Sequence, residues 1–366
     1  MKTLRRLIYR EVIIAVAFVA LGFLALFFFF DFVDELPGVN RGSGGYQLSH
    51  AMLYVLLLLP NHLYELLPIA VLIGTIFVMA RLAQSSEYTI LRTSGLGPGR
   101  ALRSLLGLGV VFTLLTFAAG DYVAPAADRA AQLLKARYQG KLSVGQTGAW
   151  LKERQTERTY TVNVAALTPD GALEDVRIFE SDLQGRMVSM TQAQRAEFAP
   201  DAWLLQGVER IDFSTGSGGV AAAPSARQSE VAWATQITPE MVSVALLKPE
   251  RMRTVDLFQY IRHLNANGQT SQRYEIEFWR KVFYPLSCIV MVVLALPFAY
   301  LHFRSGGITA FVFGGVLIGI SFFLLNNVFG YIGNLRNWLP WLTAAAPGLI
   351  YSLLSLGAFG WLVLRR

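Results

Sequence analysis

The side chains that could carry out chemistry are few, and they do not form a recognised catalytic pattern. The sequence has no H-E-x-x-H, no G-x-S-x-G and no cysteine–histidine cluster, and its four histidines are scattered. Gly95-Leu-Gly-Pro-Gly99-Arg is glycine-rich but lacks the lysine and the preceding strand of a phosphate-binding loop. The single cysteine, Cys288, lies inside an apolar run. We therefore expect no enzymatic activity, no cofactor, no metal site and no disulfide in this chain.

One polar stretch between two long apolar runs is the clearest candidate for an interaction site. Residues 81–95 read Arg-Leu-Ala-Gln-Ser-Ser-Glu-Tyr-Thr-Ile-Leu-Arg-Thr-Ser-Gly. Ser85 or Ser86 can cap a short helix, Glu87 then lies in its first turn, where the helix dipole favours a carboxylate, and Gly95 can end it. Glu87 is an acid among arginines, so we expect this helix to face the cytoplasm and to dock another protein.

The composition indicates a membrane protein. Of the 366 residues, 54% are hydrophobic and 16% are charged, whereas soluble domains have about 45–50% and about 25%. A formal net charge of +7 would favour nucleic acid as a partner of a soluble protein, but here many basic residues border apolar runs, where they set topology. We therefore predict a polytopic membrane protein that does not bind nucleic acid.

Six apolar runs are long enough to cross a bilayer, at about residues 12–30, 50–80, 101–123, 281–301, 308–332 and 338–364. The first is longer than the apolar part of a signal peptide, so we expect it to be retained. Basic residues of the short loops and tails are concentrated on one side, which predicts that both termini are cytoplasmic. Glu65 and Asp121 fall near the outer boundary, so we expect no acid–base pair of the kind that proton-coupled carriers hold at midplane.

Between the third and fourth runs the pattern changes to that of β-strands. Strand-like segments with turn signals between them occur at residues 158–166, 173–181, 186–191 and 202–213. Their spacing is typical of an antiparallel sandwich or roll. The stretch 214–229 is rich in glycine and alanine, and we interpret it as a flexible loop.

An amphipathic helix is predicted after the β-strands, capped by Thr254 and ended by Gly268, with one apolar side formed by Val255, Phe258, Ile261 and Leu264. The predicted domains are residues 1–127 with three transmembrane helices and the cytoplasmic helix at about 84–95, the outer β domain at 128–253, a connecting helix at 254–272, and three more transmembrane helices at 273–366. The fold class is therefore an α-helical membrane protein with three spans on each side of an inserted β domain.

Four stretches carry a resemblance to a known family: residues 81–87 with Ser94-Gly95, Gly120-Asp-Tyr-Val-Ala-Pro125, Phe278-Trp-Arg-Lys-Val-Phe-Tyr-Pro285 and Phe32-Val-Asp-Glu-Leu36. With the arrangement of spans, they resemble the LptF/LptG permease family of the lipopolysaccharide export system, and most closely its LptG branch. The resemblance covers nearly the whole chain. It implies a β-jellyroll-like domain in the periplasm and a location in the inner membrane of a Gram-negative bacterium.

The resemblance also implies partners and a role. The chain would be half of a transporter, paired with an LptF-like subunit, two LptB-like ATPase subunits that use ATP and magnesium, and a single-span LptC-like protein, and together they would extract lipopolysaccharide from the membrane. The polar helix would be the coupling helix in the ATPase groove, through Ser86, Glu87, Ile90 and Leu91. Glu87 would meet an arginine of the ATPase; alternatively, it only stabilises the helix N-terminus.

Contacts to the lipid are predicted in two groups. The acyl chains need a large apolar surface, for which the candidates are Phe27 and Phe30 together with the fifth-span residues Phe311, Leu317, Phe322 and Leu325. LptG relatives carry lysines near the outer end of the first span, but this chain has Asp31, which would repel a phosphate unless it turns away or a cation offsets it. We expect Arg41 and Lys135 to take over much of the phosphate contact.

Three questions stay open from the sequence. Gly315 and Gly319 form a G-x-x-x-G that suits close packing, either on a partner's first span or within this chain. A mechanotransmission protein of the MacB/LolC type is an alternative function, although those proteins place the large domain after the first span. A membrane scaffold or sensor is another, and it would bind no ATPase.

Overall fold

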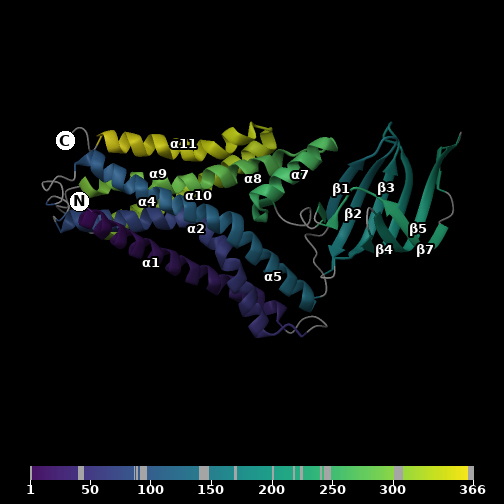
Figure 1. Cartoon of the computed structure of the whole chain (residues 1–366), viewed down its shortest axis with the longest axis horizontal. Coiled ribbons are helices and arrows are strands. Elements are labelled where there is room, and N and C mark those ends of the chain that lie inside the picture. Colours follow the sequence, from purple (N-terminus) through teal and green to yellow (C-terminus); the bar gives the residue numbers. More distant parts are fainter. Residues whose placement is uncertain are drawn as a thin grey trace. The chain divides into compact units, whose positions relative to one another are not determined.

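The computed structural model describes residues 2–39, 45–85, 87, 90, 97–139, 148–168, 171–199, 202–216, 219–222, 226–239, 241–242, 249–300 and 308–361 (Figure 1). The chain divides into two compact units. The membrane unit comprises Met1–Asp34, Val55–Ala127 and Gln272–Arg366, and the sheet unit comprises Glu35–Tyr54 and Asp128–Ser271. The sequence analysis had not placed residues 35–54 with the β domain.

Among the described residues, six helical stretches are long and apolar enough to span a membrane, as predicted. The helices are α1 (Lys2–Glu35), α2 (Leu48–Gln84), α4 (Pro98–Ala118), α5 (Ala124–Gln139), α8 (Gln272–Phe283), α9 (Ser287–Ala295), α10 (Ile308–Arg336) and α11 (Pro340–Phe359). Short 3₁₀ segments at Tyr284–Leu286 and Leu296–Tyr300 flank α9. The second span is one continuous helix through Pro60 and Pro68.

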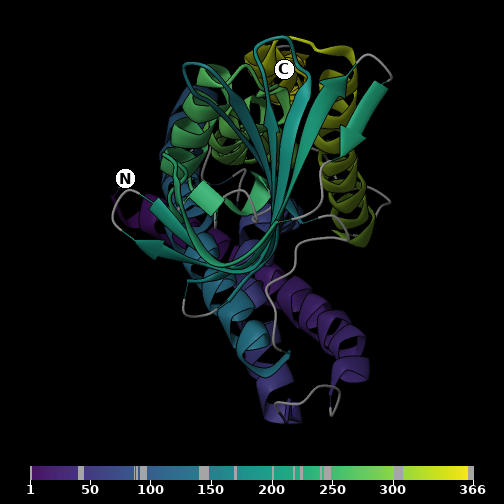
Figure 2. The ribbon, with the colours of Figure 1, turned by 90° about the vertical axis from the view of Figure 1, so that its right-hand side faces the viewer.

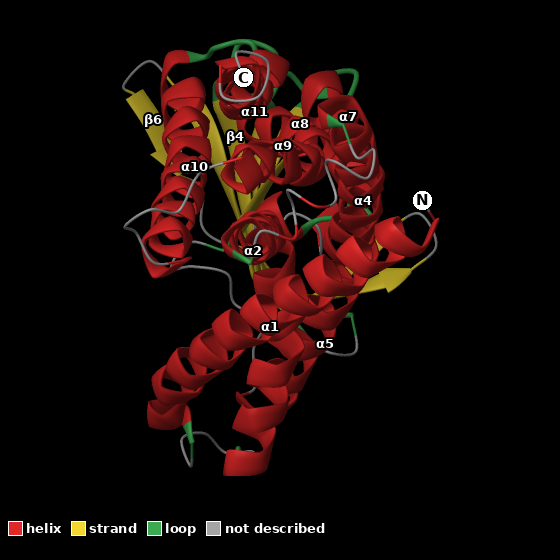
Figure 3. Cartoon of the chain, turned by 90° about the vertical axis from the view of Figure 1, so that its left-hand side faces the viewer, coloured by secondary structure: helices red, strands yellow, loops and turns green. Residues whose placement is uncertain are grey.

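The core of the membrane unit is apolar and includes Val16 of α1, Leu72 of α2, Phe112 of α4, Cys288 of α9 and Phe322 of α10. Because α9 packs against α4 and α11, it is the most enclosed part of the fourth span (Figure 3). In a bilayer the lipid tails are as apolar as these side chains, so van der Waals packing, rather than removal of apolar surface from water, favours this assembly. Cys288 is fully buried, as expected for a packing residue.

The sheet unit is an antiparallel sheet in which strands β1 to β6 lie in the same order as in the sequence. They are β1 (Ala149–Arg154), β2 (Thr159–Leu167), β3 (Leu173–Ser181), β4 (Met187–Ala199), β5 (Ala202–Gly216), β6 (Gly219–Ala222) and β7 (Ala226–Ala234), with β6 and β7 both pairing with β5. The sheet is strongly curved (Figure 2). Alternate residues such as Leu151, Ile178 and Trp203 form its core, and the Trp203 indole donates to the Ile237 carbonyl at 2.7 Å.

Two expectations about this unit were wrong. The described part of 214–229 forms the end of β5, all of β6 and the start of β7 rather than a loop. The apolar side predicted for the connecting helix α7 (Thr254–Ala266) is not the buried one: Leu257, Tyr260 and Leu264 are buried, so only Leu264 of the predicted side is in the core, whereas Val255 and Phe258 are exposed. The buried face also carries a carboxylate, Asp256, which binds two arginines and fixes the rotation of the helix.

Candidate functional site

The structure describes two of the four predicted coupling residues, Glu87 and Ile90. Glu87 and Ile90 are helical and exposed, and the Ile90 side chain is 62% exposed. They lie three residues apart, so they share one side of a helix and offer a carboxylate next to an apolar group. Ser86 and Leu91 lie outside the described residues. Arg81 at the start of this stretch is paired with Glu11 of α1 at 2.7 Å.

Lys135 of α5, a predicted phosphate contact, is already paired. Its ammonium donates to Glu35 at 2.9 Å and lies 4.6 Å from the centroid of the Tyr54 ring. The Glu35 side chain is only 10% exposed, whereas that of Lys135 is 36% exposed. The carboxylate of this ion pair is therefore buried in the sheet unit, and the lysine still reaches solvent. Burial and the nearby Glu35 carboxylate raise the pKa of Tyr46, which therefore stays neutral. Glu35 was not predicted as the partner of Lys135. Arg41, the other predicted phosphate contact, lies outside the described residues.

Asp31 has a side-chain partner within this chain. His62 of α2 contacts the Asp31 carboxylate through Nε2 at 2.7 Å. The Phe27 ring stacks on the same histidine, with ring centroids 4.7 Å apart. The two alternatives for Asp31, that it turns away from the phosphate or that a cation offsets it, stay predictions.

The fifth-span residues proposed for acyl chains do not share one surface. Phe322 is 1% exposed and packs edge-on against Tyr351, so in this structure it lies in the core of the membrane unit; its contact with acyl chains stays a prediction. Phe311 and Leu325 are half-buried against the same core, and only Leu317 of the four is exposed. In the first span, Phe30 is exposed and Phe27 is half-buried on His62.

The glycine motif of α10 packs within this chain. A Cβ atom on Gly315 would lie 2.8 Å from Ile76, and one on Gly319 would lie 2.7 Å from Ile69, both in α2. These distances are shorter than real Cβ contacts, so any larger residue at either position would force the facing isoleucine to move, and the two glycines favour this close approach. The glycine face of α10 therefore packs on α2 of the same chain, one of the two possibilities that the sequence left open.

Buried charges, which the sequence analysis did not expect, occur where two of the motif stretches meet. Asp121 and Lys281 are each 6% exposed. The Lys281 ammonium donates to the Gly120 carbonyl at 3.0 Å, and the neighbouring Arg280 donates to Glu277 at 2.8 Å. Reading each span separately could not reveal this cluster, because its members are about 160 residues apart in the chain.

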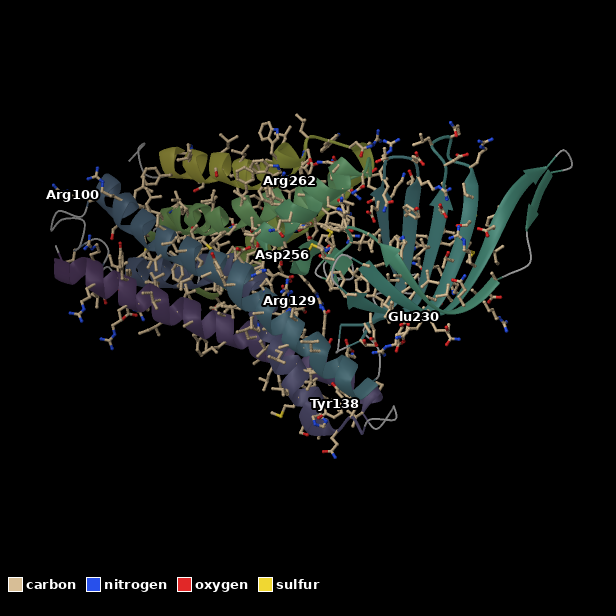
Figure 4. All side chains as sticks on the ribbon, turned by 45° about the vertical axis from the view of Figure 1, so that its right-hand side comes forward. Arg100, Arg129, Tyr138, Glu230, Asp256 and Arg262 are labelled. Carbon is tan, nitrogen blue, oxygen red and sulfur yellow. The ribbon has the colours of Figure 1, made fainter. Side chains whose placement is uncertain are left out.

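A second charged network holds α7 in the sheet unit. Asp256 accepts from Arg129 of α5 at 2.8 Å and from Arg253 at 2.9 Å, and the Arg129 and Asp256 side chains point toward one another in Figure 4. Arg251 pairs with Asp128 at 2.7 Å. These arginines therefore join helices. Within the described part of the chain, no group of three or more histidines, cysteines or acids could hold a metal.

An apolar cavity of about 470 Å³ lies in the membrane unit between α1, α2 and α4. Its walls are leucines together with Pro60, Ala118, Ala119 and Val123, and they include none of the residues predicted to contact acyl chains.

The family model "Lipopolysaccharide export system permease LptF/LptG" matches residues 6–365. The chain belongs to the LptF/LptG family. It is 30% identical over 344 residues to the lipopolysaccharide export system permease protein LptG of Escherichia coli strain K12, covering 92% of this chain and 90% of that protein. It is 25% identical over 368 residues to LptG of Haemophilus influenzae, covering 100% of this chain and 99% of that protein.

Membership of the LptF/LptG family confirms the predicted fold class, with six membrane helices and an inserted antiparallel sheet. It also confirms the function as a permease subunit of lipopolysaccharide export and a place in the inner membrane. The MacB/LolC-like and scaffold alternatives do not agree with a family match over almost the entire chain.

Proposed function

We propose that this chain is the LptG-like half of a lipopolysaccharide exporter, paired with an LptF-like subunit, two LptB-like ATPase subunits and an LptC-like single-span protein. The observation that carries the proposal is the family match across residues 6–365 on a chain with six candidate spans around an antiparallel sheet. ATP and magnesium are used by the ATPase subunits and not by this chain. Both termini are cytoplasmic and the sheet unit is periplasmic.

Coupling to the ATPase runs through the segment after α2. The exposed Glu87 carboxylate pairs with an arginine of the ATPase, and Ile90 packs beside it, with Ser86 and Leu91 completing the contact. The exposure of Glu87 and Ile90 supports this role, because a docking residue must be accessible before its partner binds. A carboxylate among basic residues gives a single, specific point of charge complementarity.

The lipid phosphates are contacted by Lys135, with Arg41 as a second cation and the LptF-like subunit supplying the rest. The Lys135–Glu35 pair supports a simple exchange, in which a phosphate replaces the carboxylate at the ammonium. Lys135 is 36% exposed, so the exchange can occur from solvent. Because the His62 ring contacts the Asp31 carboxylate at 2.7 Å, the outer end of α1 presents a carboxylate with a side-chain partner rather than an isolated one.

The test is lipopolysaccharide binding by purified complexes that carry single substitutions in this chain. Lys135→Ala should weaken binding by about 10-fold or more, the effect of losing a charged hydrogen bond. Glu35→Gln should strengthen it, because the internal competitor loses its charge. Lys152→Ala in β1 is the matched control and should have no effect.

Two results would count against this account. If Lys135→Ala binds as tightly as the parent, phosphate recognition lies elsewhere in the complex. If the parent complex neither binds lipopolysaccharide nor copurifies with an ATPase, the exporter assignment itself is wrong. Asp31→Lys adds a further readout, since tighter binding would show that the outer end of α1 faces the head group.

A further inference from the structure

The apolar cavity of the membrane unit is as long as one leaflet of a bilayer is deep. Along α2 its wall runs from Leu56 to Leu67. These residues are 11 positions apart, which corresponds to about 16 Å of helix. The hydrocarbon core of a bilayer is about 30 Å thick, so each leaflet contributes about 15 Å. The cavity therefore matches the length of an acyl chain that extends from a head group to the middle of the membrane.

The volume of the cavity suits one acyl chain and not a helix. About 470 Å³ spread over about 16 Å gives an average width of about 6 Å, whereas a helix with its side chains is about 10–12 Å wide. A cavity of about 150 Å³ holds one benzene with its six carbon atoms, so at the same density this one holds about 18 carbons. That is one fatty acyl chain. The many chains of a lipopolysaccharide would not fit.

Small residues and helix irregularities leave this space between the spans. Ala118 and Ala119 lie in the wall, where α4 passes into the π-turn Ala119–Val123, and Pro60 lies in the wall on α2. The described side chains of the wall are all alkyl groups, whereas a buried water needs two to four polar partners. Protein interiors contain few voids of this size. Hydrocarbon from the surrounding bilayer is therefore the occupant that the wall favours.

The exposure of the wall residues indicates how a lipid would enter. Leu56 and Val123 are exposed at one end of the cavity, whereas Leu67 at the other end is 9% exposed. Tyr122, the neighbour of Val123, is 64% exposed, and tyrosines are enriched at the boundary between membrane and water. The exposed end therefore lies at the level of the lipid head groups, and a chain entering there would point toward Leu67.

We propose that this cavity is a binding site for one acyl chain of a membrane glycerophospholipid, whose head group and second chain remain in the bilayer. Leu24 of α1 lies in the wall together with residues of α2 and α4, so the bound chain joins the first span to the other two. The site is separate from the residues proposed to contact the exported lipid, and it does not depend on which lipid the complex exports.

Photolabelling of the purified complex tests the site without any substitution. The complex is reconstituted in vesicles of phosphatidylethanolamine and phosphatidylglycerol that contain phosphatidylethanolamine with a diazirine in one acyl chain. A diazirine at the end of the chain should label Leu67, and one near the head group should label Leu56 or Val123. Leu26 of α1 is 50% exposed and lies outside the wall, so it reports ordinary boundary lipid. Labelling of Leu26 as strong as that of Leu67 would overturn the proposal.

Filling the cavity provides the second test. Ala118→Phe should lower the labelling of Leu67 by about 10-fold or more, because the ring takes the space of the chain. Ala25→Phe adds the same ring to an exposed position of α1 outside the wall and should change nothing. Equal labelling of Leu67 in the two variants would refute the site. If Ala118→Phe does not assemble, the labelling pattern of the parent decides.

Two other occupants are also distinguished by these measurements. If lipopolysaccharide displaces the phospholipid label from Leu67, the cavity holds the exported lipid and the proposal is wrong. If the phospholipid labels the cavity of the chain alone but not that of the assembled complex, a partner subunit covers the site, which also refutes the proposal for the exporter.

Discussion

Gly74 of α2 marks the closest approach of the first two spans, and a single methyl group there should disturb them. A Cβ at this position would lie 2.7 Å from the backbone nitrogen of Val16 and 2.9 Å from its Cα, against 3.4–4 Å for ordinary contact. Rotation of a side chain cannot relieve a clash with backbone atoms. Gly74→Ala must therefore push α1 away from α2.

The expected cost follows from two opposing effects. Overpacking of a well-packed site costs about 1–3 kcal/mol, and the better helix propensity of alanine returns up to about 1 kcal/mol. Because the clash is with a helix backbone, we expect a net loss of about 1–2 kcal/mol. The displacement should also reach Phe27, which lies 11 residues beyond Val16, about 16 Å along the helix. The stacking of Phe27 on His62 should weaken accordingly.

Thermal unfolding of the purified complex measures this effect, with Gly22→Ala in α1 as the matched control. A Cβ on Gly22 meets nothing within 4 Å, so that variant should be as stable as the parent or slightly more stable. Gly74→Ala should unfold at a lower temperature, and Gly74→Val at a still lower one. Equal stability of Gly74→Ala and Gly22→Ala would refute the close packing of α1 on α2.

Two further substitutions test the coupling contact and the network around α7. Glu87→Ala should lower complex assembly or lipid-dependent ATP turnover, because an arginine of the ATPase would lose its partner; unchanged assembly and turnover in Glu87→Ala and Glu87→Lys would reduce Glu87 to a helix cap. Asp256→Ala should destabilise the chain by about 1.5–3 kcal/mol, since it removes a buried carboxylate that binds two half-exposed arginines. Glu197→Ala, which breaks an exposed pair in β4, should change the unfolding temperature little, and equal losses for both variants would contradict the argument.

The sequence predicted those features that depend on one segment at a time. Apolar length alone predicted the six spans, and regular alternation predicted β3 at the residues where it occurs. β7 was missed because most of its side chains are exposed, so no alternation marks it and backbone pairing with β5 defines the strand. The third span was predicted to end at about residue 123, whereas the helix continues through the π-turn at Ala119–Val123 to Gln139.

The partners of the charged residues could not be predicted from the sequence, because they come from segments that are far apart in the chain. Glu35 and Lys135 are 100 residues apart, and Gly120 and Lys281 are 161 residues apart. The burial of Phe322 could not be predicted for a related reason: its helix is apolar on every side, so hydrophobicity cannot tell a core-facing side chain from a lipid-facing one. Only the packing of α10 on its neighbours makes that distinction.

The internal pairing of Lys135 has a consequence for an exporter, which must release its lipid as well as bind it. A free ammonium would gain the full attraction of a phosphate, whereas one held by Glu35 gains only the difference between phosphate and carboxylate. The carboxylate remains close to the lysine, so it can recapture the ammonium when the lipid leaves. Under the proposed role of Lys135, Glu35 therefore lowers affinity but makes lipid binding reversible, which would give a function to the buried carboxylate beside this lysine.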